Sequence, residues 1–175
     1  MIVCGVDPGA NGGIVALDRA GKIVCASRCL QTASDGGVAS RPSAAFGFWE
    51  RLRVESDQGD RVAGACVEEP ICFVGGKAAP KSIVAVALSA GAWLSLIAER
   101  TGCQRIYLVP PRTWQSAVLG KFGSGESKAR AEMFARGVWG DEPRLKHTRG
   151  FHDGLVDAAC IAQYCLGRSR LEGWA

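Results

Sequence analysis

Residues 1–28, MIVCGVDPGANGGIVALDRAGKIVCASR, decide the fold at the very start of the chain. The apolar run Met1–Asp7 predicts a strand that ends in the turn-forming sequence Asp-Pro-Gly-Ala-Asn-Gly-Gly. Gly13–Leu17 and Lys22–Arg28 predict two further strands, joined by a turn at Asp18-Arg19-Ala20-Gly21. These three strands predict an antiparallel meander.

Strands and helices alternate through the rest of the chain. We expect strands at Arg61–Glu68 and Arg105–Val109, and helices at Ala44–Val54, Ser82–Arg100, Arg112–Leu119, Glu126–Gly137 and His152–Leu166. Thr32–Ser43 is rich in Gly, Ser and Ala and is expected to be a loop, and His147–Gly150 a polar connector. Ser82–Arg100 carries apolar or small residues all round, so we expect a well-buried helix.

This order of elements predicts an α/β fold. A meander followed by two strand–helix units gives a mixed five-stranded sheet, with two parallel strands beside the meander and helices on both faces. The 175 residues, 47% of them hydrophobic, suit one globular domain over residues 1–175. That length argues against large two-domain nucleotide-dependent enzymes, and two histidines leave little room for a His-rich metal site.

The eight cysteines predict reduced, buried thiols and not a disulfide framework. Most of them sit inside apolar runs, no C-x-x-C pair occurs, and no signal peptide precedes the first strand. No apolar stretch reaches the roughly 20 residues that a membrane-spanning helix needs. We therefore expect a soluble, cytoplasmic protein with no membrane partner.

Positive charge is concentrated in one part of the chain. The net charge is +4, and residues 100–150 hold ten Lys and Arg against four Asp and Glu. Such an excess suits a polyanionic partner, and a solvated basic face is the alternative interpretation.

Four acidic residues carry the chemistry that the sequence predicts. Asp7 and Glu68 end two strands, and if these are adjacent and parallel, both carboxylates emerge at one edge of the sheet. Asp153 and Asp157 are four apart, so they share a face of the last helix. Four such oxygen donors would suit Mg²⁺ or Mn²⁺, and two ions about 3.5–4 Å apart could activate water and stabilise the leaving oxygen of a phosphodiester.

Separate structural roles for these acids are the alternative. Asp7 could cap the Pro8-Gly9 turn, and Asp153 could favour the N-terminus of the last helix. Asp157 is the hardest to explain structurally, because it lies inside the apolar stretch Leu155–Ile161 with no basic residue four positions away.

Three motifs in this order resemble RuvC-type Holliday-junction resolvases, which have the ribonuclease H-like fold. They are Gly5-Val6-Asp7-Pro8-Gly9, Val67-Glu68-Glu69 and His152-Asp153-Gly154-Leu155-Val156-Asp157-Ala158-Ala159. The resemblance runs from the first strand to the last helix and omits mainly Thr32–Asp60.

The resemblance implies a homodimeric, metal-dependent crossover junction endodeoxyribonuclease of DNA recombination and repair. Such an enzyme makes symmetric nicks in branched, four-way DNA, with two Mg²⁺ ions per site that Mn²⁺ could replace. The resemblance places the metal-binding carboxylates at Asp7, Glu68, Asp153 and Asp157. Glu68 is chosen over Glu69 because it matches the family's apolar-Glu step, and strand alternation points the two side chains to opposite faces.

The last motif departs from that of the well-known bacterial members. They have Asp, or sometimes His, three residues before the final Asp, where this chain has Gly154. The His-Asp-Gly sequence is more similar to the phage and organellar branches. His152 either assists the attacking water or leaving group, or only begins the helix.

DNA contacts are expected from the basic segment. The stretch from Gly123 to Lys128 is similar to the family's loop before a DNA-contacting helix, and a flexible connector is the alternative. Lys121, Lys128 and Arg130 are the candidates for phosphate contacts. Phe73 either wedges into the junction centre by stacking on a base or packs in the core or dimer interface.

Three other functions compete with junction resolution. Another nuclease of the same fold would share the chemistry and act on RNA or non-junction DNA. An actin-like or sugar-kinase protein, which also carries Asp-x-Gly in its first hairpin, would need two such domains. A junction-binding protein that does not cut would gain affinity for DNA by losing the acidic residues, so their presence argues against this function.

Overall fold

The computed structural model describes residues 1–9, 11–28, 31–34, 37–40, 42–55, 61–70, 80–121, 125–147 and 150–174. The elements in chain order are β1 (Ile2–Asp7), β2 (Gly13–Asp18), β3 (Ile23–Arg28), β4 (Gln31–Ser34), β5 (Gly37–Ser40), α1 (Pro42–Glu55), β6 (Val62–Glu68), α2 (Pro80–Thr101), β7 (Ile106–Val109), α3 (Pro111–Leu119), α4 (Ser127–Trp139), η1 (Pro143–Leu145), β8 (Lys146–His147), β9 (Gly150–Phe151) and α5 (Asp153–Glu172).

The central sheet has five strands in the order β3-β2-β1-β6-β7. The pairs β1–β2 and β2–β3 are antiparallel, whereas β1–β6 and β6–β7 are parallel, so the expected mixed sheet is confirmed. Val6 lies opposite Val67 in the register of β1 and β6. Asp7 and Glu68 directly follow Val6 and Val67, so the two acids lie side by side at the same edge of the sheet.

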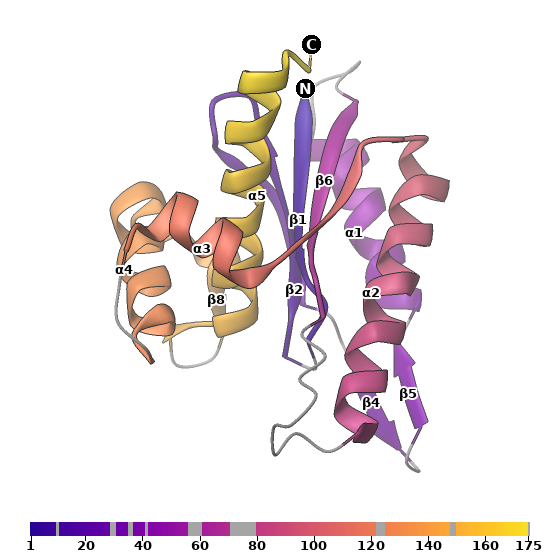
Figure 1. The fold of residues 1–175 in the computed structure, drawn as a ribbon. Coiled ribbons are helices and arrows are strands. Elements are labelled where there is room, and N and C mark those ends of the chain that lie inside the picture. The colour runs from indigo at the N-terminus through magenta and orange to yellow at the C-terminus, as the bar shows by residue number, and fades with distance from the viewer. Residues whose placement is uncertain are drawn as a thin grey trace.

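Strand alternation divides the core into two layers (Figure 1). One sheet face packs against α3, α4 and α5, and the other against α1 and α2. The α5 side includes Val3, Val15, Leu17, Ile23 and Cys66, and the α2 side includes Ile2, Cys4, Val6, Ile14, Ala65 and Val67. Asp7 and Glu68 continue the first set, two residues beyond Gly5 and Cys66, so they belong to the α5 side.

Helix α5 lies directly on β1 because Gly5 has no side chain. A Cβ at Gly5 would stand 2.1 Å from the backbone N of Ala162 and 2.3 Å from the carbonyl O of Ala158. Figure 1 shows that α5 runs opposite to β1. The N-terminal turn of α5 is thereby brought to the carboxyl ends of β1 and β6.

Two segments expected to lack regular structure contain short strands. β4 pairs antiparallel with β5 within the expected loop, and β8 pairs with β9 across the expected connector. Neither segment has a long apolar run. The side-chain pattern therefore does not predict these two strand pairs.

The expectation that α2 is well buried is wrong for the outer side of the helix. Trp93 and Ile97 are buried against the sheet, but Val84 is 56% and Leu88 is 63% exposed. The reason is that α2 covers one face of the sheet and, within the described residues, nothing covers its outer side.

The cysteines behave as expected where the structure describes them. Cys4, Cys25, Cys66, Cys103, Cys160 and Cys165 are buried and form no disulfides. Cys29 and Cys72 lie outside the described residues. In the part of the chain that the structure describes, no helix has the length and apolarity required to cross a membrane.

Candidate active site

Asp7 ends β1 and turns its carboxylate back toward the following loop. The backbone N–H of Gly9 donates to Oδ1 of Asp7 at 2.8 Å, so Asp7 does cap the turn. Burial raises the pKa of Asp7, and the Gly9 hydrogen bond and the charge of Lys128 act in the opposite direction. One oxygen of Asp7 is thus oriented by the backbone.

Glu68 ends β6 and is held from the side of α3. The indole Nε1–H of Trp114 donates to Oε2 of Glu68 at 2.8 Å. Burial and then the charge of Asp7 raise the pKa of Glu68 to about 7, although the Trp114 hydrogen bond lowers it. Glu69, the neighbouring acid, is exposed.

Asp157 lies one turn into α5 and is mostly buried beside these two acids. Burial raises its pKa to about 7, together with the charges of Asp7, Glu68 and Asp153, and Lys128 acts against the rise. The mutual effects show that the carboxylates of Asp7, Glu68 and Asp157 share one electrostatic environment.

Asp153 stands at the outer edge of this group. Its Oδ2 accepts a hydrogen bond from Nζ of Lys128 at 2.8 Å, and the two side chains are 62% and 73% exposed. The charges of Asp153, Asp157 and Asp7 all raise the pKa of Lys128, with the Asp153 hydrogen bond the largest cause. Lys128 is therefore a cation at the mouth of the acidic group. A small pocket there is lined by Lys128, Glu132, Phe151, Asp153, Val156 and Asp157.

His152 occupies the N-cap position of α5. Its backbone carbonyl accepts from the N–H groups of Leu155 and Val156, and its Nδ1 lies 3.4 Å from the N of Leu155. The cap favours the interpretation that His152 begins the helix.

The departure at Gly154 has a steric explanation. Gly12 and Gly154 form a backbone bridge, so the turn after β1 rests on the first turn of α5. A Cβ at Gly154 would lie 1.8 Å from the carbonyl O of Asn11 and 2.6 Å from the Cα of Gly12. No side chain fits at this position, and the acid of the last motif stands at Asp153 instead.

The donor set fits hard divalent cations, although the side chains are not arranged around an ion. Among the residues that the structure describes, no three His, Cys, Asp or Glu side chains are grouped closely enough to hold a metal. Asp7, Glu68 and Asp157 nevertheless supply carboxylate oxygens from three elements, and their mutual repulsion would be relieved by a cation. The chemistry of these residues fits Mg²⁺ or Mn²⁺.

The structure describes two of the other residues expected to contact DNA. Arg130 pairs with Glu126 at 3.3 Å on α4, and Lys121 is exposed just beyond α3. Phe73 lies outside the described residues, as do residues 122–124 of the expected loop.

Two residues near the acids were not anticipated from the sequence. Trp114 binds Glu68, and Glu132 lines the small pocket beside Lys128. Trp114 is a buried aromatic residue one turn after Pro110-Pro111. An aromatic residue at this position indicates that the helix packs against the protein, but it does not indicate which residue the indole contacts. Glu132 looks like an ordinary surface residue that pairs with Arg136, four positions on.

The raised pKa values predict that stability depends on pH when no divalent ion is present. Glu68 and Asp157 ionise near pH 7 in the folded protein, whereas unfolded carboxyl groups ionise near pH 4. The unfolded state therefore loses its protons first, and the free energy of unfolding falls as pH rises from 5 to 7. In EDTA we expect a loss on the order of 5 kcal/mol between pH 5 and pH 8, because each of the two groups keeps its proton for about two pH units longer in the folded protein and one pKa unit corresponds to about 1.4 kcal/mol.

Urea denaturation at a series of pH values measures this loss. Asp157→Asn should flatten the curve and leave the variant more stable than wild type at pH 8. Equal stability of the wild-type protein at pH 5 and pH 8, or a gain at pH 8, would contradict the electrostatic description of the site.

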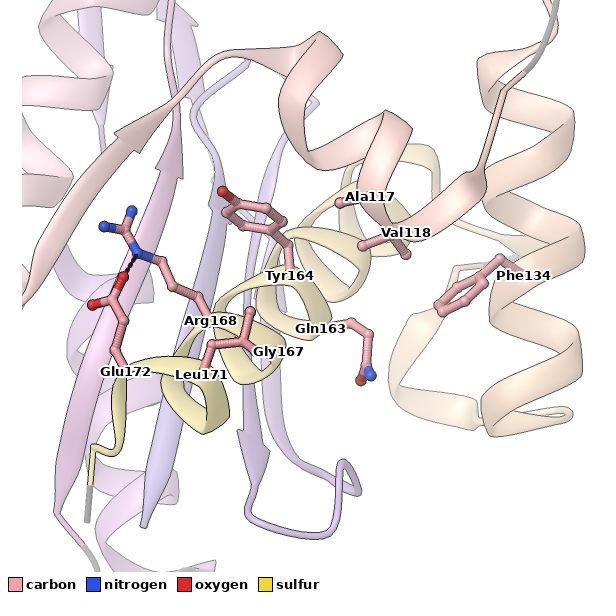
Figure 2. Close-up of a pocket in the computed structure, with 9 residues that line it drawn as sticks. All are labelled: Ala117, Val118, Phe134, Gln163, Tyr164, Gly167, Arg168, Leu171 and Glu172. Carbon is pink, nitrogen blue, oxygen red and sulfur yellow. Dashed lines mark hydrogen bonds and ion pairs between the residues drawn. The ribbon is translucent and has the colours of Figure 1, made fainter.

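A larger hollow lies elsewhere, beside the C-terminal half of α5. It has a volume of about 670 Å³ and is lined by Ala117, Val118, Phe134, Gln163, Tyr164, Gly167, Arg168, Leu171 and Glu172. Figure 2 shows mainly apolar side chains from α3, α4 and α5, with the two charged ones, Arg168 and Glu172, bonded to each other. The four acids do not line it, so this hollow is separate from the acidic site.

Comparisons with known proteins agree with this architecture. No protein-family model and no curated protein matches the sequence. Among solved structures, "T. thermophilus RuvC in complex with Holliday junction substrate" matches with a TM-score of 0.62 and 21% identity, over 98% of this chain and 96% of the other. "Thermus thermophilus RuvC structure" matches with a TM-score of 0.51 and 22% identity, over 100% and 98% of the two chains. The chain therefore has the ribonuclease H-like fold seen in these RuvC structures.

Proposed function

We propose that this protein is a metal-dependent endonuclease that resolves four-way DNA junctions. One observation carries the proposal: Asp7, Glu68 and Asp157 are mostly buried, lie at one edge of the sheet and repel one another. Groups of buried carboxylates with raised pKa values are typical of functional sites. The fold shared with a RuvC bound to a Holliday junction supports the substrate class.

In this proposal Asp7, Glu68, Asp153 and Asp157 hold two Mg²⁺ ions, for which Mn²⁺ can substitute. Bound there, the ions would supply an activated water and charge stabilisation for the leaving oxygen of the phosphodiester. The chain itself orients the donors: the Gly9 N–H holds Asp7, and the Trp114 N–H holds Glu68. Lys128 neutralises part of the acidic field at the mouth and would move between Asp153 and a DNA phosphate.

A panel of substrates tests the proposed activity. Labelled four-way junction, matched duplex DNA and an RNA–DNA hybrid are incubated with the protein and Mg²⁺. We expect paired, symmetric nicks in the junction and little cutting of the other two. Faster cutting of the hybrid or duplex would favour another nuclease of this fold, and binding without cutting would favour a junction-binding protein.

The basic residue at the mouth is expected to contribute to binding. Lys128→Ala should weaken junction binding and reduce the slope of log affinity against log salt by about one, since one phosphate contact is lost. Lys22→Ala is the matched control, because Lys22 is an exposed lysine in the β2–β3 turn at the far end of the sheet. Titrations in EDTA at several salt concentrations measure the junction affinity and the salt slope of both variants. An unchanged slope for Lys128→Ala would remove Lys128 from the phosphate contacts.

We also propose a homodimer that places two sites against one junction. The outer side of α2 presents a stripe of exposed small or apolar residues at helical spacing, which a second copy of the chain could cover. The stripe consists of Val84, Ala87, Leu88, Gly91, Ala92 and Ser95.

Leu88→Glu is therefore expected to convert the dimer to monomer, because it buries a charge in the proposed interface. Val54→Glu is the control, since Val54 on α1 is also apolar and 74% exposed. Sedimentation equilibrium gives the masses. The proposal of a dimer interface on α2 would be wrong if Leu88→Glu kept the wild-type mass, or if the wild-type protein were already monomeric.

A further inference from the structure

The indole of Trp114 is placed to act on the acidic site without reaching its substrate. Trp114 is only 1% exposed, so it cannot touch DNA. Its Nε1–H reaches Oε2 of Glu68 from α3, across 46 residues of sequence. Any effect of Trp114 on the site must therefore pass through Glu68.

The backbone at the end of β7 fixes this contact. Val109 pairs with Glu68, and the N–H of Glu69 donates to the carbonyl of Val109 at 2.9 Å. Pro110 and Pro111 then turn the chain into α3, where the N–H of Trp114 points to the Pro110 carbonyl at 3.4 Å. The indole is consequently held one helical turn beyond the end of β7, the strand that pairs with β6 and places Val109 opposite Glu68.

An indole N–H has properties suited to orienting a metal-binding carboxylate. It is a donor only, and it is neutral, so it fixes the carboxylate without the positive charge by which Lys or Arg would compete with a cation. It occupies a site on Oε2 and leaves Oε1 to other partners. Groups that orient metal ligands in this way typically change metal affinity 10–100-fold when removed.

We propose that Trp114 is a positioning residue: its N–H holds Oε2 of Glu68, and this restraint strengthens the binding of a divalent ion by the Glu68 carboxylate. This inference rests on the proposed metal-dependent function and deepens it. The indole of Trp139 offers a matched control, because its Nε1–H donates to the backbone carbonyl of Gly21 at 2.9 Å, at the far end of β2.

The test measures Mn²⁺ affinity by titration calorimetry on the whole protein, without DNA. Trp114→Phe removes the N–H, and a second variant carries 3-benzothienylalanine at position 114, which keeps the shape of the indole and lacks the donor. We expect both to bind Mn²⁺ about 10–100-fold more weakly than wild type. Trp139→Phe should bind Mn²⁺ as wild type does.

The alternative to positioning is that Trp114 only fills the core. In that case the benzothienyl variant, which preserves packing, would bind Mn²⁺ within twofold of wild type, and the inference would be overturned. Equal weakening in Trp139→Phe would also overturn it. A wild-type protein that binds no Mn²⁺ would instead overturn the proposed function, and Trp114 would lose its role with it.

Discussion

Asp157→Asn is expected to abolish junction cleavage while junction binding survives. Asp157 is the acid whose pKa is raised by all three of the other acids, so its carboxylate lies within the field of each of them. An amide in its place keeps the shape and removes the charge that would attract a divalent ion. The cleavage rate should fall by more than about 100-fold, because removal of a group that only orients a metal ligand already costs up to about 100-fold in metal affinity or activity. Asp7→Asn is expected to have the same effect.

Cleavage rates with Mg²⁺ and binding in EDTA separate the two effects. Asp141→Asn is the control, because Asp141 is an exposed acid that pairs with Lys146. The same Asp157→Asn substitution should stabilise the metal-free protein at pH 8, which is the behaviour of a site that trades stability for function. A variant that still cut junctions at a near-native rate would refute the assignment of Asp157.

Gly154→Ala is expected to cause a large loss of stability. The new Cβ would lie 1.8 Å from the carbonyl O of Asn11, and the atoms it meets are backbone, which cannot rotate away. Either the turn after β1 or the N-terminus of α5 must shift. We expect a loss of more than about 3 kcal/mol in the free energy of unfolding, above the usual range for overpacking.

Gly167→Ala, in the same helix, is the matched control. Among the described residues, no atom apart from the neighbouring residues and the helix's own backbone lies within 4 Å of a Cβ at Gly167, so this substitution should stabilise the helix by up to about 1 kcal/mol. Urea denaturation of the two variants gives the comparison. Similar stabilities would mean that the turn and the helix are not in the tight contact described above, and an acid could then be placed at position 154.

The strands of the sheet could be predicted because burial on both faces leaves a strong signal. Met1–Asp7, Gly13–Leu17 and Arg61–Glu68 are apolar runs bounded by turns, and each is a strand of the structure. The β4–β5 hairpin carries no such run, so the sequence pattern predicts a loop there. The outer face of α2 differs from the expectation because a composition that is apolar and small all round does not distinguish a buried helix from one that is covered on one side only.

The positions of the acids could be predicted from register and alternation. Two parallel strands that end together place Asp7 and Glu68 side by side, and alternation directs Glu68 toward α5 while Glu69 is exposed. What the sequence could not provide are contacts between distant segments. The bond from Trp114 to Glu68 and the pair of Lys128 with Asp153 depend on how α3 and α4 pack against α5.

Crystals soaked in Mn²⁺ provide the most direct test of the claim that these acids form a divalent-ion site. Anomalous difference maps locate Mn²⁺ without reference to activity. We expect density bounded by the carboxylates of Asp7, Glu68 and Asp157. Crystals that take up Mn²⁺ elsewhere and leave these three carboxylates without density would contradict the account.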